Sequence, residues 1–282
     1  MNILDGKAVS QNLKEQLKIK IADFEREFGR KITLAVVMAG DNPASAVYVR
    51  NKIKAAEYVG IKSLSFKLPS TVSEAEVKDV VSALAEDKTV DGILVQLPLP
   101  EGIDESSVLS IIPPEKDVDG FTEINVGKLM LGKPCSAACT PKGIITLLKA
   151  SGVCLSGKNA VVIGRSNIVG KPLAMLLLKE NCTVTVCHSK TENLAEICKR
   201  ADILVAALGR SRFVGADMVK QGAVVVDVGI NRTESGLTGD VDFENVKDIA
   251  SMITPVPGGV GPMTIATLME NTYECALRRE KR

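Results

Sequence analysis

The stretch Ala160-Val-Val-Ile-Gly-Arg-Ser-Asn-Ile-Val-Gly-Lys-Pro172 decides the fold of this chain. An apolar run ends at Gly164, small and turn-forming residues follow, and a helical pattern begins at Leu173. This order predicts a buried strand, a tight turn and a helix. We expect backbone N–H groups to be free at the start of the helix, where the helix dipole favours a phosphate. The pattern is typical of the phosphate-binding turn of a dinucleotide-binding α/β unit.

The turn departs from the common G-x-G-x-x-G pattern, so an ordinary strand-to-helix connection is the alternative interpretation. Ser166 takes the place of the second glycine, and Gly170 comes one residue late. NAD-preferring sites usually carry an acidic residue at the end of the next strand, which we expect over 183–187. This chain has a histidine, a serine and a lysine at 188–190, and Arg165 in the turn. A cation and hydroxyl groups suit a 2′-phosphate, so the sequence favours NADP over NAD.

Composition narrows the classes of partner. A net charge of +1 argues against nucleic acid or an anionic membrane as the main partner. The chain has no tryptophan and only 3% aromatic residues, so platforms for stacking bases are not expected. Its 282 residues fit one large or two medium domains, and 45% hydrophobic content is ample for a core.

Cysteine and histidine usage bears on location and metal binding. The seven cysteines are scattered without C-x-x-C spacing, which suggests reduced thiols in a cytoplasmic protein. We find no signal peptide and no apolar run long enough to span a bilayer. His188 is the only histidine, and it lies beside the expected adenosine end of the cofactor rather than the reacting end. No cluster has metal-ligand spacing, so we predict no metal.

Strand and helix patterns alternate along the chain, which predicts a parallel sheet in each of two α/β domains with a cleft between them. The first domain comprises residues 1–140, together with a C-terminal helix over about 269–282, and should hold the substrate. The second, residues 141–268, is a Rossmann-type parallel sheet. Strands are expected over 32–39, 62–68, 90–97, 160–163, 183–187, 203–207, 223–228 and 250–253. Helices are expected over 7–29, 42–60, 73–86, 141–150, 173–178 and 264–279.

Several polar side chains are predicted at the carboxyl ends of strands, where open α/β sheets bind ligands. Tyr48 and Lys52 are four residues apart and share one face of the helix after the first long strand. Gln96 ends the third strand, and a glycine- and proline-rich loop over 255–262 follows the last. The alternative is a surface tyrosine and a solvated lysine. A lysine acts as a base near neutral pH only if burial or positive charge lowers its pKa.

Two further segments have a functional and a structural interpretation. Asp119 could accept two N–H bonds from an aminopyrimidine-like ring, but Asp119-Gly120 also reads as a simple turn. Thr140, in Cys139-Thr-Pro-Lys142, could line a nicotinamide. The alternative is a helix start, with Thr140 as the cap and Pro141 in the first position.

Taken together, seven segments carry a more specific resemblance, and they span nearly the whole chain. They are Ser45-Ala-Val-Tyr-Val-Arg-Asn-Lys52, Gly92-Ile-Leu-Val-Gln-Leu-Pro-Leu-Pro100, Pro114-Glu-Lys-Asp-Val-Asp-Gly120, Cys139-Thr-Pro-Lys-Gly143, Gly164-Arg-Ser-Asn-Ile-Val-Gly-Lys-Pro172, Asp227-Val-Gly-Ile-Asn231 and residues 255–264. In this order they closely resemble the bifunctional methylenetetrahydrofolate dehydrogenase/methenyltetrahydrofolate cyclohydrolase family. The irregular nucleotide turn is the form that this family uses.

The resemblance implies NADP-dependent oxidation of 5,10-methylenetetrahydrofolate, followed by hydrolysis of the methenyl product to 10-formyltetrahydrofolate. By the same resemblance, Lys52 assists proton movement, Gln96 holds that lysine, Tyr48 positions the folate and Asp119 binds the pterin. These are the expected catalytic residues, and they also bind substrate, together with Pro257 and Gly258 at the border of the folate. The expected cofactor-binding residues are Gly164, Arg165, Ser166, Ser189, Ile230 and Thr140.

Other interpretations stay open at this point. The matched catalytic positions show no departure from the family, which favours both activities, but some family members are dehydrogenases only. Another two-domain NADP dehydrogenase, of the shikimate or amino-acid type, is a rival enzyme, and a non-catalytic NADP sensor is a rival of another class. The resemblance also implies a homodimer, formed through the second domain.

Overall fold

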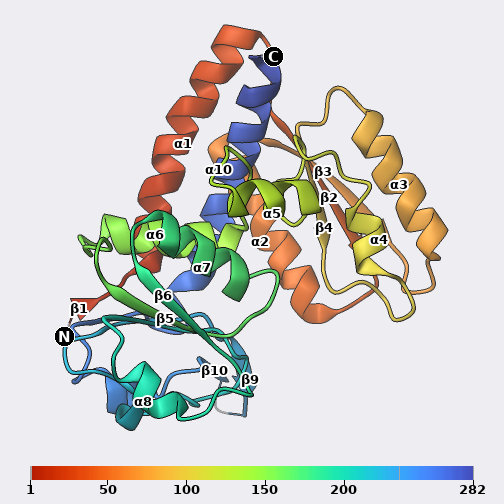
Figure 1. Cartoon of the computed structure of the whole chain (residues 1–282). Coiled ribbons are helices and arrows are strands. Elements are labelled where there is room, and N and C mark those ends of the chain that lie inside the picture. The colour runs from red at the N-terminus through yellow and green to blue at the C-terminus, as the bar shows by residue number, and fades with distance from the viewer. Residues whose placement is uncertain (1, 235, 282) are drawn as a thin grey trace. The chain divides into compact units, whose positions relative to one another are not determined.

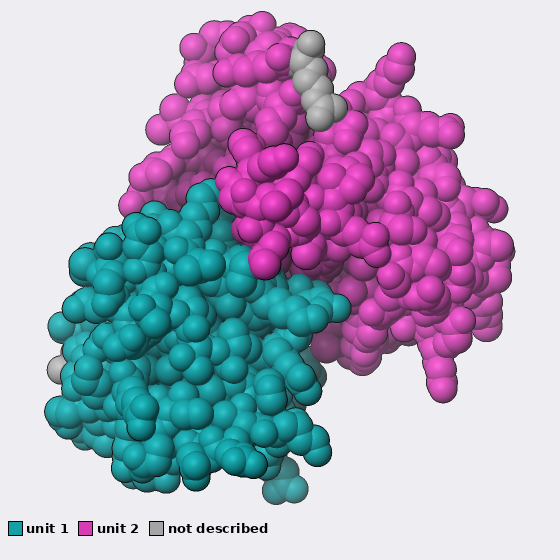
Figure 2. Space-filling model, viewed as in Figure 1, with its two compact units in different colours: residues 1–10, 140–264 teal, residues 11–139, 265–282 magenta. Residues whose placement is uncertain are grey.

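The computed structural model describes residues 2–234 and 236–281. The chain divides into two compact units, shown in Figure 2. Unit 1 comprises residues 1–10 and 140–264, and unit 2 comprises residues 11–139 and 265–282. Along the described parts of the chain, none of the helices is both long and apolar enough to cross a membrane.

Unit 2 is built on a parallel sheet with the strand order β3-β2-β4. The strands are β2 (Thr33–Ala39), β3 (Lys62–Leu68) and β4 (Gly92–Gln96). The helices are α1 (Gly6–Phe28), which enters from unit 1, α2 (Pro43–Val59), α3 (Glu74–Glu86), α4 (Glu105–Leu109), α5 (Glu123–Met130) and the larger part of α10 (Val260–Glu280).

The central strand β2 is buried along its whole length because helices cover both faces of the sheet. Leu34, Val36 and Met38 point to one side, where they pack with apolar residues of α1, α2 and α10. Ala35 and Val37 point to the other side, against α3 and α4. Figure 1 shows these two layers of helices on either side of the sheet. Burial on both faces explains why β2 reads as a continuous apolar run rather than an alternating one.

Helix α2 begins and ends where its sequence predicts. The Asn42 side chain accepts hydrogen bonds from the N–H groups of Ala44 and Ser45, at 2.9 and 3.2 Å, and Pro43 occupies the first turn. Gly60 ends the helix with φ 93°, a left-handed conformation that suits glycine. The predicted capping box of α3, Ser73 with Glu76, is also present. These local signals place α2 at the carboxyl edge of the sheet, where the candidate site lies.

Unit 1 contains a parallel sheet with the strand order β1-β11-β8-β7-β5-β6, as in doubly wound nucleotide-binding folds. The strands are β1 (Asn2–Ile3), β5 (Asn159–Ile163), β6 (Thr183–Cys187), β7 (Ile203–Ala206), β8 (Val224–Asp227) and β11 (Met252–Ile253). A hairpin of β9 (Asn231–Thr233) and β10 (Gly236–Thr238) follows β8. The helices are α6 (Cys139–Ala150), α7 (Gly170–Lys179), α8 (Leu194–Cys198), α9 (Phe243–Val246) and the short 3-10 helix η1 (Ala216–Met218).

The short helices α4, α5, α8 and α9 and the β9–β10 hairpin were not expected, and three further features differ from the expectations. Strand β1 was not anticipated, because a two-residue strand has no periodicity to read; it pairs with β11, so residues 1–10 lie with unit 1. Helix α6 begins at Cys139, so Thr140 is not its cap. Helix α10 begins at Val260, four residues before the predicted start, because a glycine and a proline in its first turn read as a loop.

A buried ion-pair network joins distant segments of unit 2. Asp91 is fully buried just before β4. Its carboxylate accepts hydrogen bonds from Arg30 at 2.8 and 2.9 Å, from Arg279 at 2.7 Å and from the N–H of Thr33 at 2.9 Å. Arg279 belongs to α10, so the network holds the C-terminal helix against the amino edge of the sheet.

We expect Asp91→Ala to lower the free energy of unfolding by about 3 kcal/mol, because two arginines would lose their shared carboxylate. The matched control is Asp23→Ala, which removes an exposed ion pair with Arg26 and should cost less than about 1 kcal/mol. Urea titration measures both. Equal losses in the two variants would contradict a stabilising role for the Asp91 network.

Candidate active site

The predicted lysine and glutamine meet in unit 2. Lys52, on α2, donates a hydrogen bond from Nζ to Oε1 of Gln96, at the end of β4, over 2.9 Å. Nε2 of Gln96 donates to the carbonyl of Leu97 at 2.6 Å, which leaves Oε1 facing the ammonium group. Lys52 is only 8% exposed, so it is not the solvated surface lysine of the alternative interpretation. The amide therefore holds one buried cationic group at the carboxyl edge of the sheet.

Tyr48 lies one helical turn before Lys52 and is half-buried. Burial raises the pKa of its phenol. The group therefore stays neutral over the physiological range, and a neutral phenol can donate and accept hydrogen bonds. The spacing of four residues places it on the same side of α2 as Lys52.

Asp119 carries the most informative electrostatics of the site. Burial raises the pKa of its carboxyl group to about 6, while the Lys52 ammonium lowers it, the nearby Asp117 raises it, and a hydrogen bond from Cys139 lowers it. The bond from the Cys139 thiol to Oδ1 is long, at 3.8 Å. Asp119 is thus close enough to Lys52 to interact electrostatically. Much of its hydrogen-bonding capacity remains for a ligand.

The loop that carries Asp119 is anchored by two residues that sequence reasoning missed. Asp117 is buried and accepts hydrogen bonds from the N–H groups of Gly120, Phe121 and Thr122, from the Thr122 hydroxyl and from the Asn125 amide. Lys116 donates to carbonyl oxygens of residues 84, 85 and 87 at the end of α3. The sequence signal for Asp117 is its position three residues before Gly120, because an aspartate there can accept hydrogen bonds from the backbone of the following turn.

The nucleotide turn in unit 1 requires its two glycines. Gly164 follows β5 with φ 133°, and a Cβ atom there would lie 2.2 Å from the carbonyl oxygen of Ala207. A Cβ on Gly170 would lie 2.2 Å from the carbonyl oxygen of Gly164. Strand β5 lies between β6 and β7, the point where the strand order reverses and where such sheets bind ligands. The close backbone approach at this switch point fits a pyrophosphate at the start of α7.

Ser166 explains the irregular pattern of the turn. Its hydroxyl oxygen accepts hydrogen bonds from the N–H groups of Val169 and Gly170, at 3.2 and 3.3 Å. The expectation that the N–H groups at the helix start are free is therefore wrong for these two. A serine at the second glycine position supplies a cap that a glycine side chain could not.

The remaining cofactor candidates lie in loops at the same carboxyl edge. Arg165 and Ser189 are exposed, after β5 and β6 respectively, and Ile230 is exposed after β8. His188 accepts a hydrogen bond at Nδ1 from the N–H of Lys190, so it shapes the turn after β6, as expected for a structural histidine. Thr140 contacts Thr264 through a hydroxyl–hydroxyl hydrogen bond of 2.9 Å.

Two buried carboxylates fix the loops after β7 and β8. Asp227 accepts hydrogen bonds from the N–H groups of Gly229, Asp240 and Val241, at 2.8 to 3.0 Å. Burial raises the pKa of Asp227 to about 6, and these backbone bonds oppose that rise. Asp240 accepts from the N–H groups of residues 208–210 and from the Asn231 amide. The pair sets the backbone on either side of Ile230, and sequence reasoning had assigned it no role.

The loop after β11 carries Pro257 and Gly258. The N–H of Gly259 donates to the carbonyl of Pro255, and the carbonyl of Gly258 accepts from the N–H of Lys7, both at 2.9 Å. Gly258 has φ 110°, which favours glycine. The loop is therefore tied to the N-terminal segment of unit 1.

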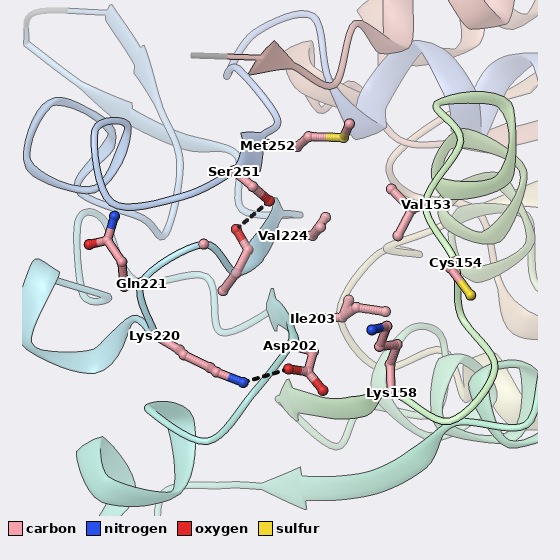
Figure 3. Close-up of a pocket in the computed structure, with 12 residues that line it drawn as sticks. Val153, Cys154, Lys158, Asp202, Ile203, Lys220, Gln221, Val224, Ser251 and Met252 are labelled. Atoms are coloured by element: carbon pink, nitrogen blue, oxygen red, sulfur yellow. Dashed lines mark hydrogen bonds and ion pairs between the residues drawn. The ribbon is translucent and has the colours of Figure 1, made fainter.

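Figure 3 shows a cavity of about 290 Å³ in unit 1 that is not the nucleotide site. Lys158, Asp202 and Ser251 line it, and each directly precedes a strand of the parallel sheet. The cavity thus lies at the amino ends of the strands, opposite the edge where Gly164 lies. Asp202 is paired there with Lys220 at 2.6 Å. Among the described residues, no group of three or more histidine, cysteine or acidic side chains could hold a metal ion.

A doubly wound sheet with a nucleotide turn, joined in one chain to a unit holding a buried lysine, is typical of nucleotide-dependent oxidoreductases of two α/β units. Comparison with known families makes this specific. The model of the catalytic domain of tetrahydrofolate dehydrogenase/cyclohydrolase matches residues 4–119, and the model of its NAD(P)-binding domain matches residues 138–280. The chain belongs to the tetrahydrofolate dehydrogenase/cyclohydrolase family.

Similar proteins match this chain over nearly their full length. A bifunctional protein FolD from Agathobacter rectalis is 54% identical, over 98% of this chain and 99% of the relative. The structure of the bifunctional methylenetetrahydrofolate dehydrogenase/cyclohydrolase FolD from Campylobacter jejuni has a TM-score of 0.96 at 51% identity and covers 99% of both chains. The dehydrogenase-cyclohydrolase of Trypanosoma brucei, solved with NADP and an inhibitor, has a TM-score of 0.93 at 39% identity, over 99% of this chain and 98% of that one.

The raised pKa of Asp119 predicts that Asp119→Asn stabilises the protein by up to about 2 kcal/mol at pH 8. Above pH 6 the folded protein holds an ionised carboxylate that burial disfavours, and the amide removes that cost. Below about pH 4 the carboxyl is protonated in both folded and unfolded states, so the gain disappears.

Urea unfolding at pH 8 and pH 4 measures this difference. Asp87→Asn is the contrasting control, because hydrogen bonds from Thr89 lower the pKa of Asp87 and its replacement should bring no gain at pH 8. A stabilisation by Asp119→Asn that is equal at both pH values would show that burial of the charge is not its cause.

Proposed function

We propose that this chain oxidises 5,10-methylenetetrahydrofolate with NADP and then hydrolyses the 5,10-methenyl product to 10-formyltetrahydrofolate. Membership of the family and the full-length similarity to bifunctional relatives support both activities. The observation that carries the proposal is the buried Lys52–Gln96 pair, together with Asp119, whose pKa is lowered by the charge of Lys52.

Folate recognition is assigned to unit 2. An ionised Asp119 accepts N–H bonds from the amino and ring nitrogens of the pterin, a directional interaction for a carboxylate. Tyr48, neutral and half-buried, positions the ring system. Pro257 and Gly258 are assigned to folate binding on the family resemblance. A carboxylate with a pKa of about 6 is mostly ionised at neutral pH, so folate binding should weaken as the pH falls through 6.

Cofactor recognition is assigned to the carboxyl edge of the unit 1 sheet. NADP, when bound, supplies the acceptor for the hydride of the methylene bridge. Gly164 and Ser166 form the turn that receives the pyrophosphate, and Arg165 and Ser189 bind the 2′-phosphate. Ile230 and Thr140 flank the nicotinamide end. The exposure of Arg165 and Ser189 after neighbouring strands supports their role in phosphate binding.

Hydrolysis is assigned to Lys52. The methenyl product is already electrophilic, so an attacking water needs only positioning and help with proton movement. The Lys52 ammonium, held by Gln96, donates a proton from Nζ to the ring nitrogen as the bond from that nitrogen to the former methenyl carbon breaks, and it regains a proton from the hydroxyl that the water has added. The other proton of the attacking water is released to solvent. The same proposal places the protein in the cytoplasm as a homodimer. The seven cysteines, which form no disulfide in the described part of the chain, support a reducing compartment.

The direct test follows reduced nicotinamide and methenyl product after 5,10-methylenetetrahydrofolate is mixed with NADP, with NAD in parallel. Reduced NADP without lasting methenyl product is expected. Accumulating methenyl product would leave a dehydrogenase only, and no reduction with either cofactor would overturn the proposal.

In the same assay, Lys52→Met should lower hydrolysis of the methenyl product by about 100-fold or more, because proton transfer loses its side chain. The matched control is Lys54→Met, which removes an exposed lysine from the same helix and should hydrolyse normally. A Lys52→Met protein that hydrolyses the methenyl product at the wild-type rate would exclude Lys52 from this step.

A further inference from the structure

Asn271 is a buried amide on α10 that joins two segments of unit 2. Its Nδ2 donates to the carbonyl oxygen of Val118 at 2.8 Å and to that of Ala137 at 2.9 Å. It also lies 3.5 Å from the Cys139 sulfur. Asn271 is fully buried, so water does not compete for these bonds. The side chain therefore uses both N–H groups of its amide nitrogen to hold two loop segments together.

The two segments that Asn271 joins are in close contact. Val118 directly precedes Asp119, and Ala137 comes two residues before Cys139. A Cβ atom on Gly120 would lie 2.6 Å from the carbonyl carbon of Ala137, so the backbones approach as closely as a glycine permits. The Cys139 thiol donates toward the Val118 carbonyl at 3.3 Å as well as toward Asp119. A change at Asn271 would thus reach Asp119 through both segments.

We propose that Asn271 is a positioning residue for folate recognition, acting through Asp119. This inference rests on the proposed function. Asp117 anchors the loop after Asp119, and Asn271 anchors the residue before it, so the backbone of Asp119 is held on both sides. Among the described residues, the only hydrogen bond to the Asp119 carboxylate is the long one from the Cys139 thiol. Asn271 thereby fixes the orientation of the Asp119 carboxylate, which can accept further hydrogen bonds from a ligand.

The chemistry of the position requires an amide. Aspartate has the same shape, but its ionised form would turn oxygen atoms toward two carbonyl oxygens and supply no donor. Alanine would leave the carbonyl of Ala137 without this partner and open space beside the Asp119 loop. Each replacement frees the loop without touching the substrate.

The test compares Asn271→Ala with Thr272→Val in the full-length protein. Thr272 is the neighbouring buried polar residue of α10, and its hydroxyl bonds only within the helix, to the carbonyl of Leu268 at 2.7 Å. Asn271→Ala should raise the KM for 5,10-methylenetetrahydrofolate by about tenfold. This is the expected effect when a misplaced Asp119 carboxylate loses one well-oriented hydrogen bond from the folate. The KM for NADP should stay within about twofold of wild type. Thr272→Val should leave both KM values unchanged.

A double-mutant cycle with Asp119→Asn distinguishes positioning from a general loss of structure. If Asn271 acts through Asp119, then Asn271→Ala should raise the folate KM far less in the Asp119→Asn background than in wild type. Equal effects in both backgrounds, or a parallel rise in the NADP KM, would overturn the inference. If the wild-type protein reduces NADP with 5,10-methylenetetrahydrofolate and Asn271→Ala has the wild-type folate KM, the inference about Asn271 is overturned and the proposed function stands. A wild-type protein inert toward folate would overturn both.

Discussion

The hydrogen bond between Lys52 and Gln96 is the interaction on which the site in unit 2 depends. Burying an ammonium group without partners costs several kcal/mol, so the fold must supply compensation nearby. The amide oxygen of Gln96 supplies part of it, and the negative charge of Asp119 supplies another part. The capped start of α2 and the end of β4 bring these groups together, because both lie at the carboxyl edge of one parallel sheet.

Hydrogen-bond partners separate structural carboxylates from the candidate functional one. Asp91, Asp117 and Asp240 each accept four or more hydrogen bonds from backbone or side-chain donors. These carboxylates hold loops and helices in place and can accept few further hydrogen bonds. Asp119 is half-buried, and the hydrogen bond found for its carboxylate among the described residues is a long one from a thiol. A half-buried acceptor that can take further hydrogen bonds suits a ligand that brings its own donors.

The sequence was most informative where local chemistry determines structure. The Asn42 cap, the capping box at Ser73 and the apolar run of β2 predicted their elements well, because caps and periodicity act over a few residues. The strand ends predicted Lys52 and Gln96 at the same edge of the sheet, and the family resemblance predicted that Gln96 holds the lysine, as the structure shows. Strand β1 and the anchors Asp117 and Asn271 were missed. The partners of β1 and Asn271 lie in other segments, as when Asn271 reaches Val118 across 153 positions, and no local pattern encodes such a contact. The partners of Asp117 are local, so its turn chemistry was a readable signal that was overlooked.

The central claim is that a buried Lys52 charge acts on Asp119, and a carboxyl NMR titration tests it most directly. Asp119 in the wild-type protein should titrate near pH 6. Because the Lys52 ammonium lowers that pKa, the Asp119 pKa should rise further in Lys52→Met, and the Asp119 signal should vanish in Asp119→Asn. An Asp119 that titrates at the same pH in the wild type and in Lys52→Met would contradict the account.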